Sequence, residues 1–536
     1  MAPNGASARA GRLAELARGT FDLLVVGGGS VGAGVALEAS VRGLRVALVE
    51  RLDYASGASG RSTKLLHGGV RYLERAVRRL DRGEWRLVRE ALAERTAIFG
   101  QAPHLCRPLG ILAPAATTSQ RRYYALGLGL YDRLAGSATL GATRVLSASE
   151  ARNAFPQLAP GLAGGVLYYD GQFDDARLNL ALVLTAEGHG ATCVNHAEVT
   201  GLRREGGRVS GAEVTDRSSG DVVPVAARWV LNAAGPFADA VRGLDGGPPP
   251  LVQPSSGVHI VLPGDVCPPG VGLLVPRTDD GRVAFLLPWQ GHTLLGTTDD
   301  PAAPDPHPPV RAGDVSYLLA QVRPYITRPI APHEVRSAWS GIRPLVRDPR
   351  RPNTAALARD HVVIDEAGGM VTVAGGKWTT YRRIAHDAVE HLARRGLSVG
   401  PAPADPIPLV GSDGFSSELP ARLVAAGLPP AVAEHLATTY GVCAPDLLRA
   451  AVGDLRPLVA GHPYLEAEVT WAAQHEHAQA VMDVLARRIR LAFLDRNAAR
   501  VAVPRTAALL GAALGWDRQR QEAEARVALA ELDGNL

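Results

Sequence analysis

The glycine-rich turn GGGSVG constrains the fold more than any other feature of this sequence. Gly27, Gly29 and Gly32 form the pattern GxGxxG, which directly follows the apolar run FDLLVV that begins at Phe21. A helical segment comes next, and a second apolar run, LRVALVE, ends at Glu50. Short apolar runs bounded by turn signals are typical of buried parallel strands. The segment therefore predicts a strand, a turn, a helix and a second strand of a doubly wound α/β sheet.

This arrangement also predicts a dinucleotide site. The first glycine permits a tight turn, the second lets the backbone approach a pyrophosphate, and the third lets helix and strand pack closely. The helix N-terminus offers free amides to the phosphates, and the Glu50 carboxylate can accept hydrogen bonds from ribose hydroxyls. The motif does not separate NAD from FAD, and a glycine turn without a ligand is the alternative at this point.

Composition is that of a soluble globular protein. The 536 residues predict two or three domains, and 46% apolar with 21% charged residues exclude a mainly disordered chain. The four cysteines are too far apart for a metal site, or for the neighbouring thiols of the flavoprotein disulfide reductases: Cys106, Cys193, Cys267 and Cys443. We expect a reducing compartment and no metal ion.

Membrane-spanning and nucleic-acid-binding classes are not favoured. A spanning helix needs about 18 or more consecutive apolar residues, and the sequence has no such run. The N-terminal segment lacks a secretory signal and is expected to be a frayed lead-in. A formal charge of +4 suits an anionic substrate or anionic lipid, whereas the basic residues are too dispersed to predict binding of nucleic acid.

Periodicity and proline content divide the chain into regions. A long amphipathic helix is expected over residues 75–100, and the segments GRVSGAEVTD, RVAFLLPW and HTLLGTTD are typical of antiparallel strands. Proline-rich stretches near Gly246 and Pro301 flank this β-rich part, and the stretch from Pro401 is predicted to be a linker. Beyond it, the run HEHAQAVMDVLARRIRLAF predicts a helix of a C-terminal helical domain.

Two further strand-to-helix turns favour FAD. RWVLNAAGPFAD ends a strand at the small residues Ala233, Ala234 and Gly235, and VTVAGGKWTTYR places Gly375 and Gly376 where a strand meets a helix. A helix N-terminus directed at the pyrimidine edge of a flavin would stabilise the negative charge that develops there on reduction. The alternative is two tight turns without a ligand.

Longer motifs make the sequence resemble the FAD-dependent glycerol-3-phosphate dehydrogenases, within the D-amino-acid-oxidase-like flavoproteins. The resemblance lies in ASGASGRSTKLLHGGVRYLE, LNAAGPFAD, WSGIRPLV and AGGKWTTYR, and extends to YLEAEVTWAAQHEHA. It implies a Rossmann-like FAD-binding domain, an antiparallel β-sheet cap domain for the substrate and a C-terminal all-helical domain. The expected bounds are 21–105, 165–250 and 345–400 for the first, 106–164 and 251–344 for the second, and 405–536 for the third.

The resemblance also implies the residues of the cofactor site. Ser62 to Lys64 match a loop that contacts the pyrophosphate and flavin of FAD, and His67 with Gly68 matches the turn beside the isoalloxazine. Together with the glycine turns, the predicted FAD contacts are Gly27, Gly29, Gly32, Glu50, Ser62, Thr63, Lys64, His67, Gly68, Val199, Ala234, Gly235, Gly375, Gly376, Lys377 and Thr379.

For the substrate, the resemblance implies a site for a phosphorylated alcohol. The predicted contacts are Arg71, Tyr72, His259, Thr298, Arg343, Arg359 and Lys377, and the catalytic candidates are His67, His259, Arg343 and Lys377. A buried phosphate dianion needs several cationic donors, and a guanidinium can hold two oxygens at once. Hydride removal from a secondary alcohol also requires a base for the hydroxyl proton, for which either His67 or His259 is suited. A surface ion pair is the alternative for any one arginine, and a structural hydrogen bond for either histidine.

Lysine is almost absent from the chain, which has Lys64 and Lys377 against 55 arginines. Both lie in the motifs above. A compact ammonium fits where a wide, planar guanidinium does not, so both positions are expected to be sterically confined; chance survival on a surface is the alternative. The sequence also departs from the family pattern. Ser255 and Ser256 stand where lysine or arginine is usual, which removes an expected positive charge near the substrate, and Phe237 stands where tryptophan is usual.

The predicted reaction oxidises the C2 hydroxyl of sn-glycerol 3-phosphate to dihydroxyacetone phosphate, with hydride transfer to flavin N5. The family implies that a membrane quinone then takes the electrons. Contact with the membrane is expected to be peripheral, at the inner face of the cell membrane, by a cytoplasmic protein. The alternatives are a glycerol-3-phosphate oxidase that uses O2, an amine or amino-acid oxidase, and a flavin-binding sensor without turnover. The sequence does not determine the oligomeric state, and a homodimer is compatible with it.

Overall fold

The first sheet is built around parallel strands. The computed structural model describes residues 5–69, 82–247, 249–279, 281–348, 361–451 and 455–534. Its parallel strands lie in the order β18 (Val371–Gly375), β10 (Val222–Asn232), β1 (Thr20–Val26), β2 (Val46–Val49) and β7 (Thr192–Val194). The antiparallel strand β17 (His361–Asp365) pairs with β18, and the hairpin of β8 (Ala197–Glu205) and β9 (Arg208–Asp216) pairs with β10.

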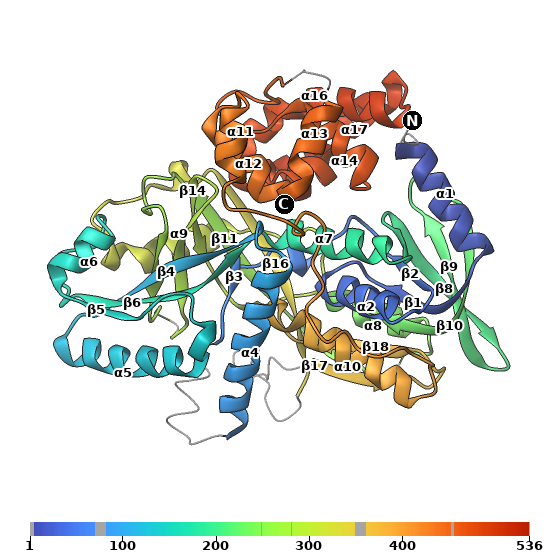
Figure 1. Cartoon of the computed structure of the whole chain (residues 1–536), viewed down its shortest axis with the longest axis horizontal. Helices are drawn as coiled ribbons and strands as arrows, with labels where there is room; N and C mark the ends of the chain where they lie inside the picture. The colour runs from blue at the N-terminus through green and yellow to red at the C-terminus, as the bar shows by residue number, and fades with distance from the viewer. Residues whose placement is uncertain are drawn as a thin grey trace.

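Helices pack on this sheet because its central strands are apolar on both faces. Leu23 and Val25 of β1 share one core with α2 (Ser30–Val41), α7 (Asp175–Gly188) and α10 (Tyr381–Arg394), whereas Leu24 and Val26 face a second core. Figure 1 shows α2 beside β1 and β2, with α7 and α10 packed on either side of α2. The predicted strand, turn, helix and strand are therefore confirmed.

The second sheet is largely antiparallel and forms the cap. Its order is β15, β11, β14, β13, β12, β4, β6 and β3, with β16 paired to β11 and β5 paired to β6; β12 and β4 are parallel. The bounds are β3 (Leu65–Leu66), β4 (Cys106–Pro114), β5 (Arg144–Leu146), β6 (Gly165–Phe173), β11 (Val252–Leu262), β12 (Val271–Val275), β13 (Ala284–Trp289), β14 (His292–Gly296), β15 (Asp300–Pro301) and β16 (Ser337–Val346). Four helices contact this sheet: α4 (Arg82–Gln101), α5 (Thr118–Ala135), α6 (Ala148–Ala154) and α9 (Ala312–Val322).

The division into domains needs one adjustment. We assigned residues 165–250 to the FAD-binding domain, but β6, which begins at Gly165, pairs along its whole length with β4 of the cap sheet. The FAD-binding segment then resumes with α7. The strand β3, which lies inside the predicted segment 21–105, also pairs with β6. We therefore propose that the cap domain includes β3 and β6, and the other bounds stay predictions.

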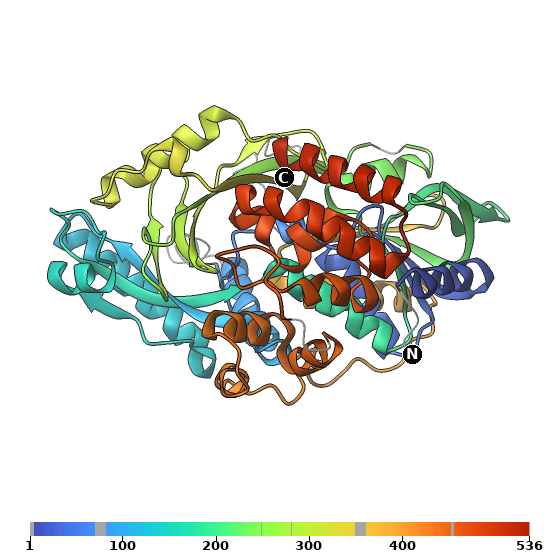
Figure 2. The same cartoon turned by 90° about the horizontal axis from the view of Figure 1, so that it is seen from above.

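The C-terminal part is helical. It contains α11 (Leu419–Ala425), α12 (Pro430–Tyr440), α13 (Ala444–Ala450), α14 (Glu466–His475), α15 (Leu491–Leu494), α16 (Arg496–Leu514) and α17 (Arg518–Asp533). Seen from above, these helices lie across the junction of the two sheets (Figure 2). Among the described residues, no helix combines the length and hydrophobicity needed to cross a bilayer.

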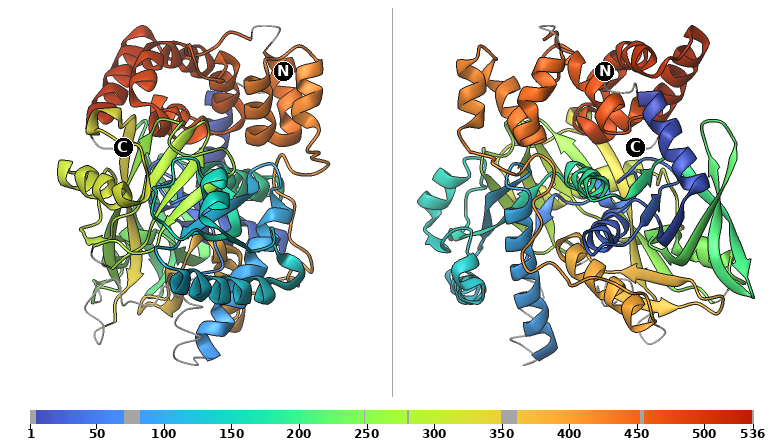
Figure 3. Two further views of the ribbon diagram at one scale, coloured as in Figure 1. Left: turned by 90° about the vertical axis from the view of Figure 1, so that its left-hand side faces the viewer. Right: turned by 45° about the vertical axis from the view of Figure 1, so that its right-hand side comes forward.

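Two local predictions are wrong. The N-terminal lead-in is an ordered helix, α1 (Gly5–Arg18), which lies beside the C-terminal helices (Figure 3). Arg9 is buried and pairs at 2.8 Å with Asp216 of β9, so α1 is fixed to the first sheet by a partner that local sequence does not reveal. The run HEHAQAVMDVLARRIRLAF is not one helix: a π-helical turn, η9 (Asp483–Arg488), precedes α15, and His477 (φ 58°) and Arg490 (φ 61°) break the periodicity.

A buried ion cluster ties η9 to the parallel sheet. Asp53 is 0% exposed and lies in the loop after β2. Its carboxylate accepts hydrogen bonds from Arg487 at 2.6 Å and Arg488 at 2.7 Å, and from the Asn195 amide at 2.9 Å. Because an unpaired charge is costly to bury, these contacts fix the position of the C-terminal domain on the first sheet.

Asp53→Asn should lower the free energy of unfolding by about 3–5 kcal/mol, since it leaves two buried guanidinium groups short of a counter-charge. Urea denaturation would measure the loss. The matched control is Glu418→Gln, because Glu418 (73% exposed) pairs with Arg422 (66% exposed) in solvent, where less than about 1 kcal/mol is expected. Equal losses in the two variants would contradict the importance of the Asp53 cluster.

Candidate active site

A cavity of about 1440 Å³ lies between the two sheets. The parallel sheet contributes the ends of β1, β2, β10 and β18, where the chain passes from strand to helix or loop, and the cap contributes β11, β12, β13 and β16. Carboxyl ends of parallel strands are the usual place for a ligand in such folds. The cavity is thus bounded on one side by backbone turns and on the other by side chains of the cap.

The glycine turn has the geometry that a dinucleotide requires. Gly27 has φ 110°, and a Cβ atom there would lie 2.7 Å from the Ala233 carbonyl oxygen. A Cβ on Gly32 would lie 1.8 Å from the Gly27 oxygen, so this third glycine permits helix and strand to pack, and it does not line the cavity. Gly29 is the N-cap of α2 and does line it. The N-terminus of α2 therefore meets the cavity where a pyrophosphate would bind.

Glu50 lies at the cavity wall beside this turn. Its two carboxylate oxygens accept hydrogen bonds from the backbone amides of Gly28 at 2.6 Å and Leu52 at 2.9 Å. Burial raises the pKa of Glu50, and these two amides oppose that shift. Each oxygen keeps a further lone pair, so the side chain is placed as an acceptor for ribose hydroxyls.

The other predicted turns reach the same cavity. Gly375 and Gly376 both have φ 82°, which a side chain would disfavour, and they lead from β18 to the short helix η7 (Trp378–Thr380). The predicted cofactor contacts that line the cavity are Gly27, Gly29, Glu50, Ser62, Thr63, His67, Val199, Ala234, Gly235, Gly375, Gly376, Lys377 and Thr379. This lining of backbone amides, small residues and one acceptor carboxylate fits a flavin dinucleotide.

Besides Gly32, two predicted cofactor contacts, Lys64 and Gly68, do not line the cavity. Lys64 is 0% exposed, and its ammonium turns beneath the loop to Asp175 at 2.6 Å and the Gly60 carbonyl at 3.0 Å. Gly68 donates its amide to the Tyr131 hydroxyl at 2.7 Å, and neither residue lines the cavity. The expectation that Lys64 is sterically confined agrees with its position, since its ammonium lies 5.2 Å and 5.5 Å from the rings of Trp289 and Trp339. Its direct contact with the cofactor is not supported.

His259 of β11 is held in the cavity wall by two contacts. Its Nε2 atom lies 2.9 Å from the Thr63 hydroxyl, and its ring stacks on Trp339 with centroids 5.5 Å apart. Trp339 is its cross-strand partner in β16, so the motifs around SGVHIVLP and WSGIRPLV face one another across one strand pair. The ring is 2% exposed. Its orientation is therefore determined by the cap sheet and by the loop that carries Thr63.

The electrostatic surroundings keep His259 neutral. Burial lowers its pKa well below the ordinary histidine value, and the positive charges of Lys64 and Arg343 lower it further. A neutral imidazole at pH 7 can accept a proton, which a catalytic base must do. His67 lines the same cavity, so the structure brings both histidine candidates to it.

Hydrogen bonds to neighbouring residues of the cap hold the Arg343 guanidinium in place. Its Nη2 donates to the Thr297 hydroxyl and the Thr298 carbonyl at 3.0 Å, and its Nη1 lies 3.3 Å from both Asp299 and the Ser256 carbonyl. A Cβ on Gly257 would lie 2.2 Å from this guanidinium, so Arg343 occupies the wall next to the serine pair. Ser255 donates to Asp299, and the hydroxyls of Ser256 and Ser340 lie 2.6 Å apart. A cation is thus present beside the position where the family usually has one.

The remaining substrate candidates divide in two. Thr298 lines the cavity, and its hydroxyl accepts a hydrogen bond from the Val258 amide at 3.0 Å. Lys377 lines the cavity directly after the turn at Gly375 and Gly376. Arg71, Tyr72 and Arg359 lie outside the described residues. Sequence reasoning missed other lining or supporting groups: Arg277 in the wall, Trp339 behind His259, and Asp175 beneath the loop. Trp339 was within reach, because it stands in the WSGIRP motif; Arg277 and Asp175 carry no such signal.

Comparisons with known proteins agree with this architecture. Residues 22–382 match the family described as FAD dependent oxidoreductase, and residues 403–521 match the C-terminal domain of alpha-glycerophosphate oxidase. The chain is 46% identical over 527 residues to the mitochondrial glycerol-3-phosphate dehydrogenase of Mesocricetus auratus, covering 95% of this chain and 72% of that protein. It is 42% identical over 553 residues to the mitochondrial glycerol-3-phosphate dehydrogenase of Arabidopsis thaliana, covering 97% and 87%.

Among solved structures, the glycerol-3-phosphate dehydrogenase from Bacillus halodurans complexed with FAD superposes with a TM-score of 0.80. The two are 26% identical, and the match covers 99% of this chain and 98% of that one. The likeness includes both sheets and the C-terminal helices, and the relatives confirm what the long motifs indicate. The chain belongs to the FAD-dependent glycerol-3-phosphate dehydrogenases, within the wider family of FAD dependent oxidoreductases.

Proposed function

We propose that this protein oxidises sn-glycerol 3-phosphate at its C2 hydroxyl, releases dihydroxyacetone phosphate and passes the electrons to a quinone. The observation that carries the proposal is the continuity of the cavity. It runs from the glycine turn at Gly29, past Gly375 and Gly376, to His259 and Arg343 of the cap. A dinucleotide and a small anionic alcohol can therefore meet inside one cavity.

The proposed division of labour follows from position and charge. FAD held by the turns at Gly29, Gly375 and Gly376 would supply the acceptor for the hydride of C2. The neutral His259 takes the hydroxyl proton, and its hydrogen bond to Thr63 and its stacking on Trp339 hold the ring in place for that transfer. Because the pKa of His259 is held low, the imidazole is already in its proton-accepting form at neutral pH.

The phosphate is proposed to bind between Arg343 and Lys377. Both side chains line the cavity, one from the cap and one from the turn after β18. The Nη1 contacts of Arg343 are long, at 3.3 Å, so this nitrogen can turn to a phosphate oxygen while Nη2 stays bound to the Thr297 hydroxyl. Charge-assisted bonds of this kind favour a dianionic ester over an uncharged alcohol. Arg71 and Arg359, which lie outside the described residues, stay candidates for the same role.

The acceptor is proposed to approach past α5. Tyr123 and Leu126 of this helix line the cavity yet are 48% and 75% exposed, and Arg122 is exposed on the same helix. Apolar side chains beside arginines suit the interface of an anionic membrane, from which a quinone could enter. We therefore propose peripheral contact with a membrane, at the inner face of the cell membrane; the names of the relatives place those proteins in mitochondria.

Anaerobic addition of glycerol 3-phosphate should bleach the absorbance of the bound flavin, and absence of bleaching would overturn the proposed substrate. His259→Asn should slow the bleaching by about 100- to 10,000-fold, the usual contribution of a positioned base. In the wild type, the rate at saturating glycerol 3-phosphate should stay level as the pH is lowered from about 8 to about 7, because a pKa below the ordinary histidine value leaves the imidazole neutral and the phosphate stays largely dianionic in this range.

His67→Asn is the matched control, since both imidazoles line the cavity. It should slow flavin reduction much less than His259→Asn. A larger loss in the His67 variant than in the His259 variant would assign the base to His67 instead.

Arg343→Gln should lower kcat/KM for glycerol 3-phosphate by about 10- to 150-fold, because each charged hydrogen bond to the phosphate contributes about 1.5–3 kcal/mol. Activity on unphosphorylated glycerol should change far less. Steady-state kinetics on both alcohols would measure the two effects, and an equal loss on glycerol would contradict a role in phosphate binding.

Leu126→Glu should weaken binding to vesicles of anionic phospholipid and slow reoxidation of the reduced flavin by a quinone in those vesicles, while anaerobic flavin reduction changes much less. Val527→Glu on α17 is the control, because Val527 is also an exposed apolar residue, at 62%. Equal effects of the two substitutions would contradict docking through α5. Reoxidation that is faster with O2 than with the quinone would identify an oxidase.

A further inference from the structure

A buried carboxylate lies directly beneath the loop that carries Thr63. Asp175, the first residue of α7, is 0% exposed. Its Oδ2 atom accepts hydrogen bonds from the Lys64 ammonium at 2.6 Å and from the Ser62 amide and hydroxyl at 2.9 Å and 2.7 Å. Burial alone would raise the pKa of Asp175, but Lys64 and Arg490 keep it below its ordinary value, so the group is ionised. The loop is thus fastened to the end of a helix of the FAD-binding domain.

The C-terminal domain holds the same point. Arg490, between η9 and α15, is 1% exposed. Its Nη2 donates to the Gly60 carbonyl at 2.7 Å and to Oδ1 of Asp175 at 3.3 Å, and its Nη1 donates to the Ala486 carbonyl at 2.9 Å. Lys64 donates to the same Gly60 oxygen, so the two cations share both acceptors. Residues from three distant parts of the chain therefore meet under one loop.

The backbone at both cations is in an unfavourable conformation. Lys64 has φ 64° and Arg490 has φ 61°, in the left-handed region where a side chain costs of order 1 kcal/mol or more. Such conformations persist only where the surroundings determine them strongly, and they gather at functional sites. That two of them converge on one carboxylate indicates that the position of this loop matters beyond stability.

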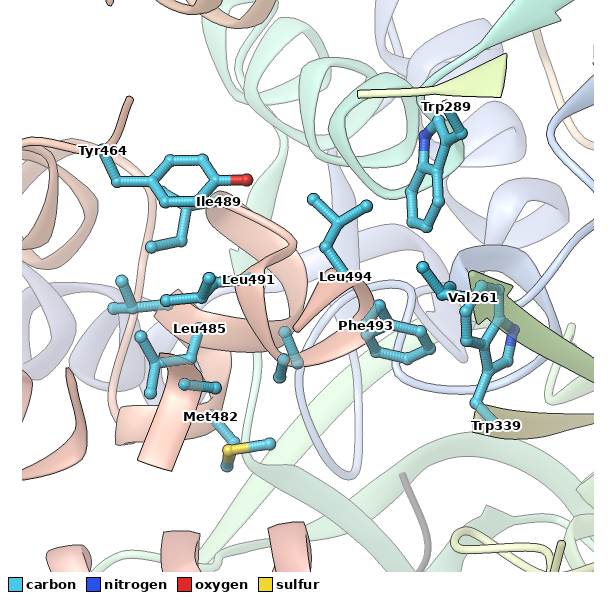
Figure 4. Close-up of a cluster of buried hydrophobic side chains, with 14 of the residues drawn as sticks. Val261, Trp289, Trp339, Tyr464, Met482, Leu485, Ile489, Leu491, Phe493 and Leu494 are labelled. Carbon is cyan, nitrogen blue, oxygen red and sulfur yellow. The ribbon is translucent and has the colours of Figure 1, made fainter. Parts of the chain in front are cut away.

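Two routes connect Arg490 to His259. One runs through Asp175 and the Ser62 loop to the Thr63 hydroxyl, 2.9 Å from the imidazole. The other is aromatic: Arg490 lies 4.5 Å from the Phe493 ring, which packs edge-on to Trp339 at 4.9 Å, and Trp339 stacks on His259. Figure 4 shows Phe493 and Leu494 of α15 inserted beside Trp289 and Trp339 of the cap. The C-terminal domain thus supports the imidazole from both sides.

We propose that Arg490 is a positioning residue for the oxidation, which holds the Ser62–Thr63 loop, and through it His259, from the C-terminal domain. The inference rests on the proposed role of His259. The C-terminal helices thereby contribute to the reaction, although they are far along the chain from the residues that line the cavity. A displacement of about 1 Å at a reacting group can reduce a rate by about 100-fold, so a loop that is no longer held in place would lower kcat.

Hydrogen exchange tests the proposal in the protein without FAD. Arg490→Met removes the guanidinium but keeps an apolar side chain of similar length. Peptides covering residues 55–66 should exchange at least about tenfold faster than in the wild type, because the Ser62 amide loses the fixed position of its acceptor. Unchanged exchange over 55–66 would overturn the proposal.

Arg487→Met is the matched control. Arg487 lies in the same segment, and its side chain is 10% exposed. After the substitution, Asp53 is still paired with Arg488, just as Asp175 is still paired with Lys64 in the Arg490 variant. This variant should leave exchange over 55–66 as in the wild type. If both variants loosen that segment equally, the effect is general destabilisation and the proposal fails.

A double-mutant cycle with Thr63→Val tests the route to His259. Arg490→Met should slow anaerobic flavin reduction by about 10- to 100-fold with a smaller change in KM. In a Thr63→Val background it should add little, since both changes break one chain of contacts, whereas Arg487→Met and Thr63→Val should combine additively. Additive behaviour of the Arg490 pair would contradict positioning through Thr63.

Two provisions keep the outcomes distinct. Should Arg490→Met fail to fold, the same cycle is run with Arg490→Lys and Arg487→Lys, which keep the charge but lose the planar fork. If glycerol 3-phosphate does not reduce the wild-type protein, the proposed function is refuted, and hydrogen exchange alone decides whether Arg490 holds the loop. Wild-type reduction with an additive cycle would refute only the role of Arg490.

Discussion

The cost of burying charge governs how the parts of this protein fit together. Asp53 and Asp175 lie in the FAD-binding domain, and the arginines that compensate them come from one short segment of the C-terminal domain. An uncompensated carboxylate at either place would be strongly destabilising, so the C-terminal helices have one position in which all charges are paired. The cavity lies immediately beyond this boundary. The buried ion pairs therefore also fix the positions of the residues that form the cavity wall.

Features that depend on residues close in sequence could be predicted. The turn at Gly27, the carboxylate of Glu50 and the two glycines after β18 follow from steric rules that act within a few residues. Predictions failed where a distant partner decides the structure. The N-terminal segment is a helix that pairs through Arg9 with Asp216, and the run around Arg490 leaves the helical path where its guanidinium reaches Gly60.

The same distinction applies to the cavity. Motif resemblance indicated His259, Arg343 and Lys377, and all of them line it. It did not indicate what orients them, because the partner of His259 across the strands and the support beneath Thr63 are set by pairing registers and by packing between domains. Lys64 shows the limit most clearly. Its motif marks it as important, but only the fold shows that its ammonium faces inward to Asp175.

The scarcity of lysine has a practical consequence. Lys64 is 0% exposed, and Lys377, the other lysine of the chain, lines the cavity. Apart from the N-terminal amine, a reagent selective for primary amines would therefore meet a side-chain target only inside the proposed substrate enclosure. Acylation of Lys377 would therefore report access to the cavity, and a bound anion would shield this single reachable lysine.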